Sequence, residues 1–336
     1  MLIASYASLH FLVDMICAWA MFSRFLETGY ESLLVYNFCA FALQMPIGTL
    51  VDLFRSHHRK LPVVCAAAGT VLTLLGAFVH PLVLGTGNAL FHVGGGVDVM
   101  EDDVTNNRRG ALLGVFVAPG AMGLYLGMVF GKSQSGLLLP IVAALLLIPL
   151  LSVCFGNTGV NPRSEQCFPQ FVSVLPVMLC CFAVVILRSW VGLDVRFDWQ
   201  STAAFSVLAV LATALGKACG GLMAARFGIV RTAVLSLIFA AMCYQWAQIP
   251  VFGLFAFFFF NMSMPLTLYL LAKNLPGMAG FSFGMLTFGI FLGFLPVYLR
   301  MDIPVSGNLA GMLCSVFSCL LLIAAGKAGC DGKVSA

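Results

Sequence analysis

Charged side chains are scarce in this sequence. Only 9% of its 336 residues are Asp, Glu, Lys or Arg, whereas soluble domains carry about 25%. A globular chain of this length would lack the polar side chains that cover a wet surface, so the composition excludes a soluble enzyme. The apolar share of 61% also excludes a disordered chain. A lipid bilayer is the solvent that fits, and we expect an integral membrane protein.

Dense basic patches and metal-binding spacings are absent as well. The net charge of +4 comes from 17 basic and 13 acidic residues spread along the chain, which argues against nucleic-acid binding. The 12 cysteines include no C-x-x-C pair. Gly280, Ser282 and Gly284 fit a G-x-S-x-G pattern, but no strand precedes them as a nucleophile elbow requires. We therefore expect no metal, no cofactor and no catalytic residue.

Apolar runs of spanning length, about 20 residues each, are abundant. Short connections with turn residues or charges separate them, and the acidic run 101–103 reads as a solvated loop or as a partner of Arg108 and Arg109. The sequence thus predicts an all-α integral membrane fold with twelve transmembrane helices, at about 1–22, 31–54, 61–79, 81–98, 109–131, 136–155, 170–192, 202–225, 229–247, 250–272, 278–299 and 305–326.

Lysine and arginine are unevenly divided between the two sides of these helices. With the N-terminus in the cytoplasm, the cytoplasmic loops and tail hold eleven of them and the outer loops hold four: Arg24, Lys132, Arg196 and Arg300. Cytoplasmic loops of membrane proteins carry the excess of positive charge. We therefore expect a multi-pass protein of the cell membrane with both termini in the cytoplasm.

Small and polar residues recur at an offset of about half the chain. The glycines of the fifth predicted helix have counterparts at one shared offset in the eleventh, and Asn88 and Gly48 have counterparts at a nearly equal offset, at Asn261 and Gly221. The glycines of the fifth helix are Gly110, Gly114 and Gly123, and their counterparts are Gly280, Gly284 and Gly293. Transporters are often built from two such halves with the binding site between them. We expect six-helix bundles over 1–155 and 170–336, joined by a cytoplasmic linker at 156–169.

Two loop motifs resemble those of the major facilitator superfamily. Gly48 and Asp52 in GTLVD, with Arg59 beyond them, are similar to the G-x-x-x-D-R-x-G-R-R/K loop pattern, although its second glycine is missing. A similar element in the second half has Ala225 in place of the acid. The resemblance implies a two-halved twelve-helix transporter fold. It also implies a gating role for Gly48, Asp52, Arg59, Gly221, Arg226 and Gly228.

The fifth predicted helix carries a further resemblance. Gly114, Pro119 and Gly123 are similar to the G-x-x-x-G-P-x-x-G-G element of the drug/proton antiporters of that superfamily. The glycine-rich segment 87–96 resembles its fosmidomycin-resistance-like members.

Polar side chains inside the predicted helices are few, and an ionisable group there costs several kcal/mol unless it has a function or a partner. His10 and Asp14 are four residues apart and so share a helix face. With His92, they form our predicted proton-coupling group. The predicted substrate-cavity residues are Gln44, Asn88, Arg188, Lys217 and Asn261. In the resembled superfamily, the first, fourth, seventh and tenth helices line the cavity. The alternative role for each residue is a structural hydrogen bond between helices.

These features predict a secondary active transporter that moves a small organic solute by proton-coupled efflux, because no ATPase motif is present. The expected partners are a small-molecule substrate, protons and the lipid bilayer, with no nucleic acid, and the expected state is a monomer. Two alternatives stay open at this point: a non-transporting membrane subunit and an intramembrane enzyme.

Overall fold

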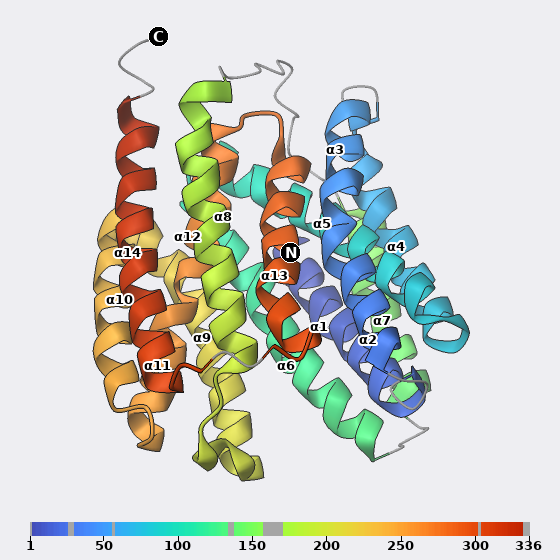
Figure 1. The fold of residues 1–336 in the computed structure, drawn as a ribbon. Coiled ribbons are helices and arrows are strands. Elements are labelled where there is room, and N and C mark those ends of the chain that lie inside the picture. The colour runs from blue at the N-terminus through green and yellow to red at the C-terminus, as the bar shows by residue number, and fades with distance from the viewer. Residues whose placement is uncertain are drawn as a thin grey trace.

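The structure is a computed structural model that describes residues 2–25, 30–55, 58–133, 138–156, 171–301 and 304–331. Within these ranges the chain is almost entirely helical and contains no strand (Figure 1). The predicted linker at 156–169 lies outside them, apart from Gly156.

The first half of the chain forms the helices α1 to α7. They are α1 (Leu2–Ala20) with the π-helical turn η1 (Met21–Phe25), α2 (Tyr30–Asn37), the π-helical turn η3 (Phe38–Ala42), α3 (Gln44–Arg55), α4 (Leu61–Val79), α5 (Pro81–Thr105), α6 (Ala111–Lys132) and α7 (Leu138–Phe155). The segments α2, η3 and α3 together occupy the second predicted span.

The second half forms the helices α8 to α14. They are α8 (Phe171–Asp194), the short 3-10 helix η4 (Asp198–Ser201), α9 (Ala203–Phe227), α10 (Ile229–Gln245), α11 (Pro250–Asn261), α12 (Ser263–Asn274), α13 (Ala279–Tyr298) and α14 (Gly307–Asp331). The tenth predicted span is divided at Met262 into α11 and α12. Each of the twelve predicted spans thus coincides with one helix or with consecutive helical segments.

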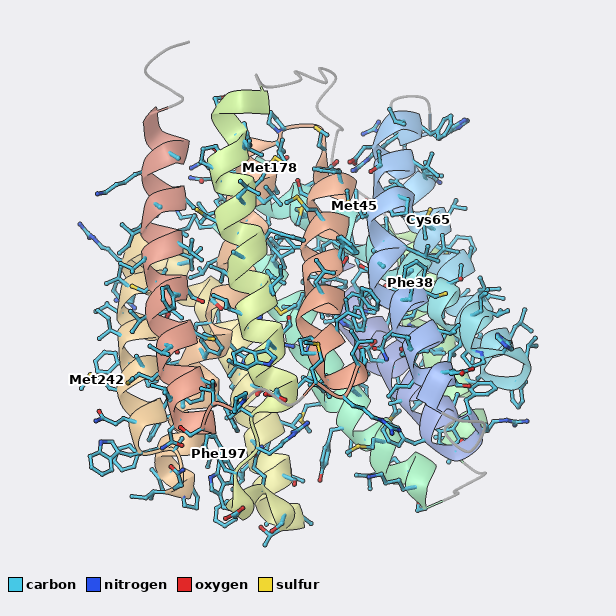
Figure 2. All side chains as sticks on the ribbon, in the orientation of Figure 1. Phe38, Met45, Cys65, Met178, Phe197 and Met242 are labelled. Atoms are coloured by element: carbon cyan, nitrogen blue, oxygen red, sulfur yellow. The ribbon has the colours of Figure 1, made fainter. Side chains whose placement is uncertain are left out.

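The outer surface of the bundle is apolar, as a bilayer requires. Nine helical segments of the described chain are long and apolar enough to cross a membrane, and two shorter apolar helices accompany them. Large apolar side chains such as Ile148 and Phe155 are exposed, and Met242 points away from the bundle on α10 (Figure 2). Hydrocarbon is the environment in which these side chains are stable. The predicted all-α membrane fold is confirmed.

One boundary differs from the prediction in a way that matters for the site. The sequence predicts that the fourth helix ends at residue 98, but the corresponding helix, α5, continues to Thr105. The acidic run 101–103 is therefore helical rather than a solvated loop, and Asp103 is fully buried. Its carboxylate accepts hydrogen bonds from the backbone N–H groups of Gly110 (2.6 Å), Leu112 (2.8 Å) and Leu113 (3.0 Å). It caps the start of α6, where these N–H groups have no helical partner.

The helices α6 and α13 lie between α2 to α5 on one side and α10, α11 and α14 on the other (Figure 1). The helix α6 packs against α1 and α9, and α13 packs against α3 and α8. The two groups of helices therefore meet along two seams, α3 with α13 and α6 with α9.

Each seam is closed by a pair of glycines that the sequence offset had singled out. A Cβ atom on Gly48 would overlap the carbonyl of Gly280, and a Cβ atom on Gly221 would overlap the carbonyl of Gly110. By the sequence offset, Gly221 is the counterpart of Gly48, and Gly280 is the counterpart of Gly110. The same offsets that suggested a repeat thus mark equivalent contacts at the two seams. Small residues allow helix backbones to approach this closely.

Candidate functional site

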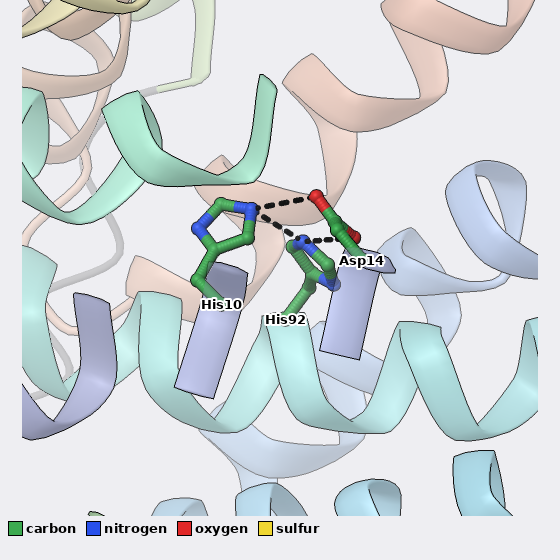
Figure 3. A group of neighbouring side chains, drawn as sticks. All are labelled: His10, Asp14 and His92. Carbon is green, nitrogen blue, oxygen red and sulfur yellow. Dashed lines mark hydrogen bonds and ion pairs between the residues drawn. The ribbon is translucent and has the colours of Figure 1, made fainter. Parts of the chain in front are cut away.

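Three buried side chains meet between α1, α5 and α6 (Figure 3). The Nε2 atom of His10 lies 3.2 Å from a carboxylate oxygen of Asp14 and 2.9 Å from Nε2 of His92. The His92 Nε2 atom is also 3.7 Å from the second Asp14 oxygen. All three residues are less than 10% exposed. The structure thus brings together the three residues of the predicted proton-coupling group, and we call them the His–Asp cluster.

Hydrogen bonds from the opposite ring nitrogens fix both imidazoles. The Nδ1 atom of His10 lies 2.8 Å from the carbonyl oxygen of Phe116 on α6, and that of His92 lies 2.9 Å from the carbonyl oxygen of Asn88. A carbonyl oxygen only accepts, so both Nδ1 atoms carry a hydrogen and donate it. The side-chain amide of Asn88 donates to Asp14 (3.1 Å). Asn88, a predicted cavity residue, therefore belongs to this cluster.

The two Nε2 atoms then set the proton count of the cluster. In two neutral rings protonated at Nδ1, both Nε2 atoms would carry lone pairs, and these would face one another at 2.9 Å. One additional proton turns this repulsion into a hydrogen bond and leaves a single positive charge shared by the rings. The Asp14 carboxylate balances that charge at 3.2 Å from His10. The geometry therefore suits one bound proton.

The same donor set could in principle ligate a metal ion. Its two imidazole nitrogens and carboxylate oxygen lie within 4.8 Å of one another, and such ligands suit zinc and similar ions. However, two ligands at about 2.1 Å from a tetrahedral zinc are about 3.4 Å apart. The 2.9 Å between the two Nε2 atoms is shorter than that, so a proton fits the arrangement better than an ion.

The helix α6 separates the His–Asp cluster from the central cavity. Gly120 faces the cluster, where a methyl group would overlap His10 Nε2 and the Asp14 carboxylate. Gly123 lies directly against the carbonyl of Phe11 on α1, so α1 and α6 are in backbone contact. Other residues of α6, including Leu124 and Tyr125, line the cavity. A movement of α6 would therefore affect the cluster and the cavity together.

The central cavity has a volume of about 710 Å³ and is lined by α6, α8, η4, α9, α10, α11, α12 and α13. Three of the predicted cavity residues, Arg188, Lys217 and Asn261, line it. Gln44 does not. It is fully buried, donates to the carbonyl of Ala40 (2.6 Å), and its own carbonyl lies against Gly284 on α13.

The cavity opens toward one end of the molecule and is sealed at the other. Its lining includes Val195, Asp198 and Ser201 in the connection between α8 and α9. At the opposite end, the glycine pairs close both seams, and Asp52 on α3 accepts hydrogen bonds from the N–H groups of Gly280 (2.8 Å) and Phe281 (2.7 Å). Asp52 thus caps α13 across the seam. We call these the open end and the closed end (bottom and top in Figure 1).

The other predicted gating residues are placed differently. Arg59 and Arg226 are exposed at the closed end, and the guanidinium of Arg226 lies 5.5 Å from the Phe227 ring centroid. Gly228 adopts a φ of 89° where α9 ends, a conformation that favours glycine. Pro119 lies inside α6, and Gly114 contacts the backbone of Lys217 at the second seam.

Sequence reasoning missed a buried ionic network at the closed end. Arg55 pairs with Glu101 and lies 3.7 Å from Asp98, which accepts a 2.7 Å hydrogen bond from Tyr6. The signal was present: Asp98 and Glu101 are three residues apart and share a face once α5 is seen to continue past residue 98. The network joins α1, α3 and α5, all from the first half of the chain.

No protein-family model matches the chain, and no curated protein matches its sequence. Its fold does match solved structures. A structure of the major facilitator superfamily transporter FucP in the outward conformation has a TM-score of 0.69 at 14% identity, covering 97% of this chain and 98% of that chain. A variant of the Escherichia coli fucose:proton symporter FucP also has a TM-score of 0.69, at 15% identity and with the same coverage.

The human organic anion transporter MFSD10 (TETRAN) has a TM-score of 0.63 at 14% identity, covering 96% of this chain and 99% of that chain. Together these likenesses show that the chain has the fold of these transporters over nearly its whole length. The finer resemblance to the drug antiporters and the fosmidomycin-resistance-like members stays a prediction.

Proposed function

We propose that this protein is a proton-coupled secondary transporter of a small organic solute in the cell membrane, with both termini in the cytoplasm. The observation that carries the proposal is the His–Asp cluster, a buried group suited to one exchangeable proton, directly behind the α6 wall of the solute-sized cavity. The fold is that of transporters, one of which is a fucose:proton symporter and another an organic anion transporter. These functions support the proposal for this chain.

Coupling follows from the position of α6. In the sealed arrangement, the Phe116 carbonyl and Gly120 hold His10 against Asp14 and His92. Opening of the closed end separates α6 from α9, and in our proposal α6 then also shifts against α1, which releases the His10 ring from the Phe116 carbonyl and from His92. Separation of His10 from His92 would leave the shared proton on one ring, in contact with entering water. It would then leave as hydronium and return when the cluster reassembles. Imidazole suits this exchange because its ring nitrogens accept and release protons as a proton shuttle does.

The direction we propose is efflux in exchange for protons. Symport, as in the fucose:proton symporter, is the alternative that the same cluster allows. With cytoplasmic termini, the open end would face outward and the closed end inward. The two directions differ in the proton movement that accompanies the solute, so one experiment distinguishes them.

The test uses purified protein in liposomes loaded with a pH-sensitive dye. Neutral sugars, organic anions and organic cations, represented by L-fucose, 1-naphthoate and rhodamine 6G, are added outside. A solute that moves with protons acidifies the lumen, and one that exchanges for protons makes it alkaline. We expect one class to give a signal that Asp14→Asn abolishes and that His80→Gln, which changes an exposed histidine outside the cluster, retains. Proton movement that persists in Asp14→Asn, or no signal with any class, would contradict the proposal.

A further inference from the structure

Two basic side chains, Arg188 and Lys217, line the central cavity, and no carboxylate of the described residues forms an ion pair with either of them. Arg188 on α8 is 6% exposed, and its Nη1 atom is buried with no hydrogen-bond partner. Across the part of the chain that the structure describes, no carboxylate lies within 4.0 Å of Arg188 or of Lys217 on α9. Arg188 and Lys217 are close enough for their positive charges to repel each other, and the Asp14 carboxylate attracts Lys217 from beyond ion-pair distance. The inner cavity therefore carries two positive charges that no carboxylate of the described residues pairs with.

Burying a cation without an ion-pair partner inside a protein destabilises the folded state. Removing an ion from water into a protein interior costs several kcal/mol unless an opposite charge compensates. The deep part of the cavity lining contains no acidic side chain among the described residues. The one acidic lining residue, Asp198, lies at the open end, in the α8–α9 connection together with Arg196. A bound anion would supply the missing charge.

The shapes of the two cations indicate the chemistry of that anion. A guanidinium presents a planar fork of N–H donors, which matches two oxygens of a carboxylate, phosphonate or sulfonate. An ammonium adds a point charge with donors that turn freely. A single acidic group held between Arg188 and Lys217 would satisfy both.

The remaining wall suits an apolar body. Tyr125, Tyr244, Phe257, Phe260 and Phe294 line the same cavity. These rings favour an aromatic or aliphatic ligand body, whose orientation the charged groups then fix. A volume of about 710 Å³ accommodates a ligand of one or two rings besides its acidic group.

We propose that the cavity binds an organic anion, with its acidic group between Arg188 and Lys217 and its apolar body against the aromatic wall. This inference rests on the proposed transport function and specifies its substrate class.

The test compares two probes of one shape in detergent-purified protein. 1-Naphthoate carries a carboxylate, and 1-naphthamide replaces it with a neutral amide. We expect naphthoate, naphthalenesulfonate or phenylphosphonate to raise the melting temperature of the protein, and naphthamide to leave it unchanged. Loss of a hydrogen bond to a charged group weakens binding about tenfold or more, so Arg188→Gln and Lys217→Gln should each weaken the anion by that factor.

Matched controls separate this role from a general loss of charge. Arg24→Gln and Lys132→Gln remove exposed cations that lie over the rings of Phe78 and Phe22, and both should bind the anion as the wild type does. Arg188→Lys restores a positive charge and should recover part of the affinity. Equal binding of naphthamide, equal binding by Arg188→Gln and Lys217→Gln, or no binding of any of the three anions would overturn the inference.

The outcomes also separate this inference from the proposed function. Proton-driven movement of a neutral or cationic solute, without anion binding, would overturn the substrate class and leave the coupling intact. Anion binding in the cavity without any coupled proton movement would overturn the coupling and leave the substrate class intact.

Discussion

The bond from Asp52 to α13 predicts how firmly the closed end is held. Asp52 lies on α3 and accepts two backbone N–H groups of α13 across the seam, at 2.8 and 2.7 Å. Asp52→Asn keeps the shape and one acceptor oxygen, but it loses the charge and one of the two bonds. A hydrogen bond to a charged group contributes about 1.5–3 kcal/mol. We therefore expect the ratio of open to closed states at this end to rise by about 10- to 150-fold.

The assay measures the labelling rate of a cysteine that only the opened end exposes. Val51, next to Asp52 on α3, is 3% exposed, so Val51→Cys should react slowly with a maleimide, after subtraction of the native cysteines. As long as the open state is rare, the rate follows its population. Adding Asp52→Asn should raise the labelling rate of Val51→Cys by about 10- to 150-fold.

Asp103→Asn is the matched control. Asp103 also accepts the N–H groups at a helix start, but both its own helix, α5, and the helix it caps, α6, lie on the same side of the seams. Its loss should lower the melting temperature without raising the labelling of Val51→Cys more than about twofold. A labelling rate that is unchanged by Asp52→Asn, or raised equally by Asp103→Asn, would refute the assignment of Asp52 as the tie between the two sides.

Three further predictions follow from the site. Gly120→Ala should abolish coupled proton movement in the liposome assay because its methyl group overlaps the His–Asp cluster, whereas Gly192→Ala, which has open space around it, should not. Arg188→Met should stabilise the ligand-free protein by about 1–4 kcal/mol in thermal unfolding, because it removes an unpaired buried charge; a lower stability would contradict that account. In intact cells, an impermeant reagent should label Ser201→Cys at the open end but not Asn106→Cys at the closed end, and the reverse pattern would invert the orientation.

The sequence predicts the features of the fold that depend on residues close together in the chain better than those that depend on contacts between distant segments. The length of the apolar runs determines the number of spans, because the bilayer thickness sets the helix length. The shared offsets of the glycines predicted which positions of the two halves are equivalent, and the glycine contacts at both seams agree with that equivalence. The predicted end of α5 was wrong because three consecutive acidic residues are typical of a solvated loop. In the structure, Asp103 is instead buried, where it caps α6.

The candidate site shows the same division. Sequence alone determined that His10 and Asp14 face the same way, because helical periodicity acts within one helix. Only the tertiary structure decided that His92 meets His10, 82 residues away in sequence, and that Asp52 caps a helix 228 residues away. It also decided that Arg188 and Lys217 line the cavity, whereas Gln44 packs against α13. Spacing specifies the face of a helix, but which neighbour that face meets depends on how all the helices rotate and pack together, and this is a property of the whole bundle.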